Sequence, residues 1–136
     1  MNSRANWVSD GTVKDFMASW NANNVLLVTD ACFSGAIFVS KSFEKSNVED
    51  INISYERKAR IAMTAGNLET VPDRSIFINY FIASLEDNKN NYISSRTIYE
   101  DLFHPVKLNT PDMNEPQWGH IVNVGDENGD FIFFKK

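Results

Sequence analysis

Cys32 is the residue of this chain most suited to nucleophilic chemistry. It is the only cysteine among the 136 residues, and it lies shortly after the continuous apolar run of residues 25–28. Such a run is typical of a strand covered on both faces, and the carboxyl ends of such strands line the ligand crevices of open α/β sheets. Backbone N–H groups near Ser34 and Gly35 could stabilise a thiolate or an oxyanion there. The alternative is that Cys32 is a small buried apolar residue, as free cysteines usually are.

The elements around Cys32 follow from hydrophobic spacing. Apolar residues at Val13, Phe16, Met17 and Trp20 predict a helix over residues 12–22, with Thr12 as its cap. Strands are predicted over residues 25–29 and 60–66. The polar stretches 40–55 and 67–74 read as loops, and long loops in compact domains are usually functional.

The second half of the chain predicts two helices and two strands. Ser75 caps an amphipathic helix, residues 87–91 form a linker, and Ser94 or Ser95 begins another helix that ends at His104 and Pro105. Residues 117–124 and 131–134 read as strands, joined through a hairpin turn at 128–129. Two strands covered by helices indicate an α/β fold, and no internal domain boundary is visible, so residues 1–136 read as one module.

Composition excludes several classes of function. A formal net charge of −5 and a pI near 4.9 argue against a nucleic-acid binder, which normally carries a basic patch. No apolar run approaches the length of about 20 residues that spans a membrane, and no polybasic run suits anionic lipid. A single cysteine rules out an intrachain disulfide framework and suits a reducing compartment, so we expect a cytoplasmic protein.

The string from Val25 to Gly35, which ends in Asp-Ala-Cys-Phe-Ser-Gly, resembles the caspase-like cysteine peptidases, especially their metacaspase-like and bacterial branch. The resemblance extends over nearly the whole chain, although only the Asp-x-Cys-x-Ser-Gly element is fairly specific. It implies a caspase-hemoglobinase-like sandwich with a mostly parallel sheet flanked by helices. It also implies that residues 1–136 are a partial catalytic domain, its C-terminal portion, with the N-terminal strands missing. Residues 119–133 would form the terminal strand pair.

The resemblance assigns roles to particular residues. Cys32 would attack the peptide carbonyl, and Asp30 would line a pocket that selects Arg or Lys by charge-assisted contact. Thr64, Ala65 and Gly66 would pair with the substrate backbone as an added strand, and Asp73 could help the basic pocket. Alternatives stay open: Asp30 could cap a strand end, Thr64 to Gly66 could be a plain strand end and turn, and Asp73 could be a solvated loop residue.

The family needs a histidine, and none precedes Cys32 in this sequence. His104 and His120 lie downstream. His104, before Pro105, is better interpreted as a helix cap or a solvent-facing residue, and His120 as a surface or half-buried structural residue of a strand. The resemblance therefore implies a partner besides the peptide or protein substrate: a segment carrying the catalytic His, supplied in cis or as a second subunit. It also implies that the apolar strand lacks a neighbour on one side. The alternative is a non-catalytic caspase-like interaction module without the histidine.

No metal ligand set or other cofactor is expected. Residues 126–130 look like a calcium loop, but the glycine is misplaced and a hairpin turn is the better interpretation. Residues 86–97 resemble such a loop faintly, with Thr97 where a bidentate Glu belongs. Calcium activation elsewhere stays open. A generic flavodoxin-like binding domain is a third interpretation, with no phosphate loop to support it.

Overall fold

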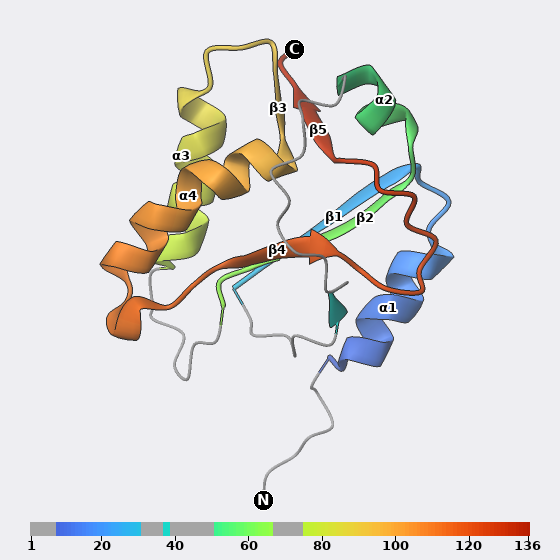
Figure 1. Cartoon of the computed structure of the whole chain (residues 1–136), viewed down its shortest axis with the longest axis horizontal. Helices are drawn as coiled ribbons and strands as arrows, with labels where there is room; N and C mark the ends of the chain where they lie inside the picture. Colours follow the sequence, from blue (N-terminus) through green and yellow to red (C-terminus); the bar gives the residue numbers. More distant parts are fainter. Residues whose placement is uncertain (1–7, 31–36, 39–50, 67–74) are drawn as a thin grey trace, which may run out of the picture.

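A three-stranded mixed sheet forms the centre of the protein. The computed structural model describes residues 8–30, 37–38, 51–66 and 75–136, the side chain of Asp112 excepted (Figure 1). Strand β1 (Asn24–Thr29) runs parallel to β2 (Ala59–Thr64), and β4 (Gln117–His120) pairs with β2 antiparallel, in the order β1-β2-β4. The α/β class predicted from the sequence is confirmed, whereas the described part of the sheet is small and mixed rather than mostly parallel.

A second, two-stranded sheet lies apart from the first. It pairs β3 (Tyr92–Ser94) with β5 (Ile132–Phe134) in antiparallel register. The hairpin predicted between residues 117–124 and 131–134 is therefore wrong, because β4 and β5 belong to different sheets. The turn at Asn128 does exist, with a left-handed φ of 59°, but it packs against the residue before β2: Glu127 N donates to Lys58 O at 2.8 Å.

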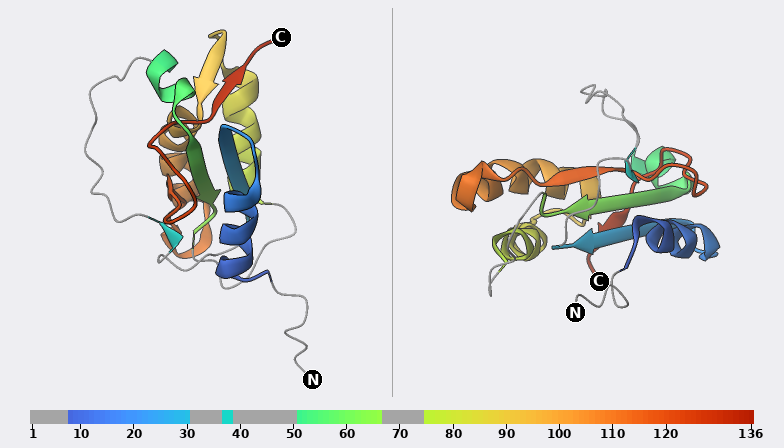
Figure 2. Two further views of the ribbon diagram at one scale, coloured as in Figure 1. Left: turned by 90° about the vertical axis from the view of Figure 1, so that its right-hand side faces the viewer. Right: turned by 90° about the horizontal axis from the view of Figure 1, so that it is seen from below.

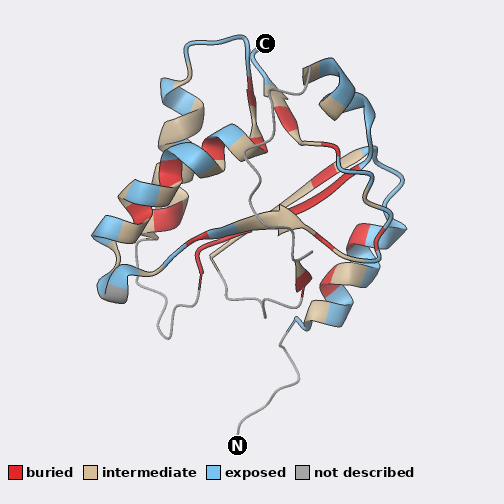
Figure 3. Ribbon diagram, in the orientation of Figure 1, coloured by how far each residue is buried: buried red, intermediate tan, exposed pale blue. Residues whose placement is uncertain are grey.

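Helices cover both faces of the three-stranded sheet, as Figures 1 and 2 show. Helix α1 (Asp10–Ser19) lies on one face, and α3 (Ile76–Asp87) and α4 (Ser95–Asn109) lie on the other. Alternate residues of β1 join different cores: Val25 packs in the cluster that contains α1, and Leu26 packs against the cluster that contains α3 and α4. All six residues of β2 are buried (Figure 3). Burial from both faces explains why these strands are continuous apolar runs.

Three helix starts show what local signals can predict. Ser75 caps α3 through a bond from Ile78 N to its side chain, as predicted, and Ser94 caps α4 in the same way through Thr97 N. The predicted cap at Thr12 is wrong: α1 begins at Asp10, and Ser9 accepts from Thr12 N at 3.1 Å. The helix therefore gains its first turn before the apolar periodicity begins.

Two predicted boundaries were also wrong. Pro105 lies inside α4 and does not end it, since the helix continues to Asn109 with Val106 fully buried. The predicted loop over residues 40–55 includes the start of helix α2 (Ile51–Glu56). This short helix has no buried residue, so its sequence carries no apolar period. A 3-10 turn, η3 (Pro111–Met113), precedes β4.

Candidate functional site at the carboxyl edge of the sheet

The parallel pairing of β1 and β2 brings four of the predicted site residues to one edge. Thr29 and Thr64 are register partners at the carboxyl ends of the two strands. Asp30 follows Thr29 directly, and Ala65 N donates to Thr29 O at 3.2 Å. Asp30, Thr64, Ala65 and Gly66 therefore lie together where the sequence analysis expected a ligand crevice. Cys32 and Asp73 lie outside the described residues.

Two polar atoms at this edge are buried without a hydrogen-bond partner in the described part of the chain. They are Oδ1 of Asp30, which is half-buried, and Oγ1 of Thr64, which is 1% exposed. A buried polar atom without a partner costs about 1–3 kcal/mol, so such atoms are rare and concentrate where a ligand or a moving group completes them. The edge therefore has unused hydrogen-bonding capacity: a carboxylate oxygen that accepts, and a hydroxyl.

The backbone at the end of β2 is covered by residues 114–116, which we call the cover segment. The side chain of Asn114 donates to Ala65 O at 2.5 Å. Gly66 has φ of 92°, and a Cβ at this position would lie 2.2 Å from Glu115 O. Only glycine fits here, because both the left-handed backbone and the close approach exclude a side chain. No local sequence pattern indicates this contact, since it joins residues that are 49 positions apart.

Neither histidine lies at this edge. His120 pairs in register with Ile61, three residues before Thr64, on the strand beyond β2 from β1. With about 4.8 Å between strands and about 3.3 Å per residue, its backbone is on the order of 14 Å from that of Thr29. His104 is exposed on α4, inside the helix and not just past its end as predicted.

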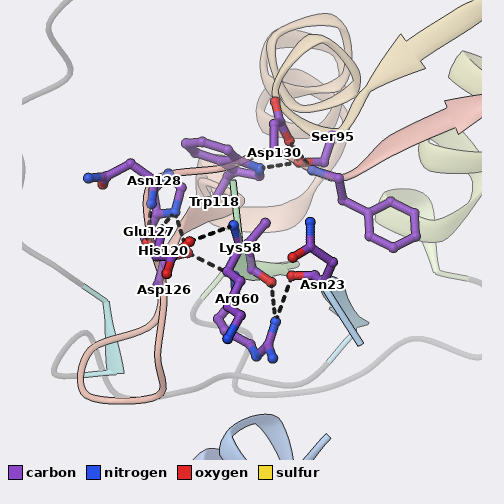
Figure 4. Close-up of polar contacts among 12 residues, drawn as sticks. Asn23, Lys58, Arg60, Ser95, Trp118, His120, Asp126, Glu127, Asn128 and Asp130 are labelled. Carbon is purple, nitrogen blue, oxygen red and sulfur yellow. Dashed lines mark hydrogen bonds and ion pairs between the residues drawn. The ribbon is translucent and has the colours of Figure 1, made fainter. Parts of the chain in front are cut away.

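His120 is part of a structural ion pair (Figure 4). Its Nδ1 lies 2.9 Å from the carboxylate of Asp126, which is 9% exposed and also accepts from Arg60 N at 2.8 Å. Burial alone would raise the pKa of Asp126, but the hydrogen bonds and charge of His120 and the bond from Arg60 N lower the pKa below its ordinary value. The half-buried structural position expected for His120 agrees with this pairing.

Arg60 fixes the end of α1 and its connection to β1. The residue is 4% exposed, and its guanidinium donates five hydrogen bonds, all to backbone carbonyls: those of Met17, Trp20, Ala22, Asn23 and Ala59. We call this arrangement the Arg60 clamp. Its sequence signal was a single cation inside an otherwise apolar strand, because a buried charge must be hydrogen-bonded or paired. The clamp sets β1 against β2 and so positions their carboxyl ends.

A second polar network joins β4 to the start of α4, also drawn in Figure 4. Trp118 Nε1 donates to Ser95 Oγ at 3.0 Å, and Ser95 Oγ donates to the Asp130 carboxylate. Burial raises the pKa of Asp130 above its ordinary value, although hydrogen bonds from Ser95, Phe131 N and Arg96 N oppose this. The network holds the N-terminal turn of α4 against β4, and it lies away from the carboxyl edge.

The two loops that resembled calcium sites are filled by internal donors. In the loop before β3, the Asn88 side chain donates to Asn90 O and Tyr92 O, and Lys135 Nζ donates to Asn88 O. In the other loop, Asp126 accepts from His120, Arg60 N and Asn128 N. Among the described residues, no group of three or more His, Cys, Asp or Glu side chains could hold a metal ion.

Comparison with known proteins identified no relative of this chain. No family model, no curated protein and no solved structure matches the chain. Within the described ranges, no helix combines the length and the apolar character that crossing a bilayer requires. The fold and the site thus define a mixed α/β domain with a polar edge at the carboxyl ends of two parallel strands.

Proposed function

We propose that this chain is the cysteine-bearing part of a caspase-like cysteine endopeptidase that cleaves after Arg or Lys. Cys32 is the nucleophile: its thiolate attacks the peptide carbonyl, the C–N bond breaks, and the acyl-enzyme is then hydrolysed. The observation that carries the proposal is the unpartnered buried oxygen of Asp30, two positions before Cys32, at the edge where β1 and β2 end together. A substrate guanidinium or ammonium group would supply the donor that this oxygen lacks.

The covered strand pair also supports the proposal. A nucleophile two positions after Asp30 would follow a strand that packs against side chains on both faces, so its attachment to the fold would not depend on a surface loop alone. The finer assignment of a caspase-hemoglobinase-like sandwich belongs to this proposal. It rests on the resemblance of residues 25–35, and the mixed α/β architecture with helices on both faces of the sheet is compatible with it.

Catalysis requires a histidine from outside the described edge, because His120 lies too far along and across the sheet. We propose that a histidine-bearing segment, in cis or as a second subunit, completes the site. Among the described strands, β1 pairs with β2 on one side only, so its other edge is available for a further strand. A monomeric 136-residue chain that turned over peptide substrate would contradict this requirement. A His-Gly element encoded upstream of Trp7 would support it.

The direct test is chemical labelling of Cys32 in the complete domain, with its histidine-bearing segment present. A peptidyl chloromethyl ketone ending in arginine is compared with one ending in aspartate, and labelling is located by mass spectrometry. The Arg probe should react faster, and Cys32→Ala should abolish labelling. Asp30→Asn should reduce the preference about 10- to 100-fold, the contribution of a hydrogen-bonded charge pair.

Asp101→Asn is the matched control, since it removes the same charge from an exposed position on α4. It should leave the preference unchanged. Equal labelling by both probes in the wild-type protein would exclude the basic pocket. A folded protein whose Cys32 reacts with neither probe would favour the non-catalytic interaction module.

A further inference from the structure

The carbonyl of Ala65 is already occupied inside the protein. A peptide adding to the end of β2 would use backbone groups of Thr64, Ala65 and Gly66. Thr64 lies between register partners Thr29 and Gln117, and the Ala65 N–H donates to Thr29 O. The Ala65 carbonyl accepts from the Asn114 side chain. A carboxamide N–H and a peptide N–H are equivalent donors, so Asn114 makes the contact that a substrate strand would make.

Asn114 is held in this position by the chain that follows it. Glu115 forms an ion pair with Lys107 of α4 at 2.5 Å, and Tyr99 of α4 donates its hydroxyl to Pro116 O at 3.2 Å. Burial and the Glu115 carboxylate raise the pKa of Tyr99 to about 12, so its hydroxyl keeps the proton that it donates. The cover segment is therefore fixed to α4 from residues adjoining Asn114.

The backbone on both sides of the contact has left-handed geometry. Met113, directly before Asn114, has φ of 51° and is 61% exposed, and Gly66, directly after Ala65, has φ of 92°. A non-glycine residue in this region costs free energy that the surrounding contacts must offset, and such strain concentrates at ligand sites and switches. Release of Asn114 from Ala65 would allow Met113 to relax.

We propose that Asn114 is an internal competitor of the peptide: its side-chain amide occupies the Ala65 carbonyl, and a substrate strand must displace it to pair with β2. This inference rests on the proposed function and adds a regulatory contact to the same edge. To admit a peptide, the cover segment would move away from the end of β2, and its contacts with α4 would change. In the resting protein the end of β2 is thus closed to peptide backbone at the Ala65 carbonyl.

The affinity of a peptide aldehyde for the complete domain, with its histidine-bearing segment present, measures the competition. The probe is an N-acetyl tripeptide ending in argininal, whose aldehyde carbon bonds reversibly to the Cys32 sulfur while the thiol proton passes to the carbonyl oxygen. Asn114→Ala should bind it about fivefold more tightly than wild type, the value of one exchanged hydrogen bond. Asn109→Ala removes an exposed amide from α4 and should bind as wild type does. The rate of alkylation by iodoacetamide, which needs no strand pairing, should be equal in all three proteins.

A measurement on the wild-type protein keeps the test independent of how Asn114→Ala folds. The Asn114 side-chain amide protons should exchange slowly with solvent in the free protein and quickly once the aldehyde is bound. Equal affinities for Asn114→Ala and wild type, with binding that Cys32→Ala abolishes, would overturn the competition and leave the proposed function standing. Absence of aldehyde binding to every variant would overturn both.

Discussion

Replacement of Arg60 by methionine tests whether the Arg60 clamp holds the sheet in register. Methionine keeps the length of the side chain and removes all five donors. Two of the five acceptors, the carbonyls of Met17 and Ala59, form buried bonds with Arg60, whereas the other three lie in partly exposed chain. The exposed carbonyls can bind water. The buried carbonyl of Met17 loses its donor, whereas that of Ala59 loses one of two, because the parallel β1–β2 ladder still pairs it.

The magnitude follows from those two carbonyls. At about 1–3 kcal/mol for the unpaired Met17 carbonyl and about 0.5–1.5 kcal/mol for the bond that Ala59 O loses, the loss reaches about 1.5–4.5 kcal/mol. Removing a guanidinium that is buried without a carboxylate partner in the described chain offsets part of this. We therefore expect Arg60→Met to lower the free energy of unfolding by about 3 kcal/mol and the melting temperature by about 10 °C. Arg60→Lys keeps the charge but has three donors in place of five, so we expect most of the same loss.

The assay is urea unfolding followed by circular dichroism at constant pH. Arg57→Met is the control, because Arg57 is exposed and the change should cost less than about 1 kcal/mol. A midpoint for Arg60→Met within the error of the wild-type midpoint would refute the reasoning that the clamp carries the packing of α1.

Four further substitutions test other parts of the structure. Thr64→Val removes a buried hydroxyl without a described partner, so the free energy of unfolding should rise by about 1 kcal/mol in urea; a loss would mean that the hydroxyl is bonded in solution. Gly11→Ala in α1 should stabilise the protein by about 0.5 kcal/mol. Gly129→Ala should destabilise it by more than about 2 kcal/mol, as overpacking does, because its Cβ would lie 2.1 Å from a backbone oxygen. Similar melting temperatures for the two variants would contradict this. The lowered pKa of Asp126 means that its stabilisation is complete above its ordinary pKa of 3.8 and is lost as pH falls through the lower folded value. Asp126→Asn should therefore flatten the fall in stability below about pH 4, and an unchanged acid limb in pH-dependent melting would exclude the linkage.

The sequence predicted those elements whose causes are local. A serine before an apolar period was enough to locate the starts of α3 and α4, and a run of branched apolar residues was enough to locate β1. Helix α4 continues past Pro105 because the packing of its apolar face stabilises it by more than the proline costs. Leu102 and Val106 are buried one turn apart and continue the apolar stripe, while the carbonyl that loses its donor belongs to Asp101, which is exposed to water.

The elements that the sequence missed depend on distant contacts. Helix α2 has no buried face, and its last carbonyls, Tyr55 O and Glu56 O, accept from the side chains of Asn23 and Asn24. Strand β5 pairs with β3 and not with its neighbour in the chain. An apolar pattern does not indicate which strands pair with each other. Pairing residues 117–124 with residues 131–134, their neighbours in the chain, was therefore wrong.

The candidate site likewise has a part that the sequence predicts and a part that depends on distant contacts. Parallel strands with a common carboxyl edge bring Asp30 and Thr64 to Gly66 together, and this followed from two apolar runs alone. The contact from Asn114 to Ala65 could not be predicted, because it depends on how the chain after α4 folds back on β2. The role of Cys32 as nucleophile stays a prediction that labelling can test.

The parallel arrangement of β1 and β2 also bears on how proteins of this design can diverge. Their alignment is fixed at the amino end by the Arg60 clamp and by Asn23 O accepting from Ala59 N, and at the carboxyl end by the bond from Ala65 N to Thr29 O. None of these contacts involves the residues between Thr29 and Arg57. Insertions or deletions in that connection that spare Asp30, Cys32, buried Ile37 and helix α2 would therefore leave the two strands aligned. The length of the connection could thus change from one descendant sequence to another while the frame of the edge was preserved.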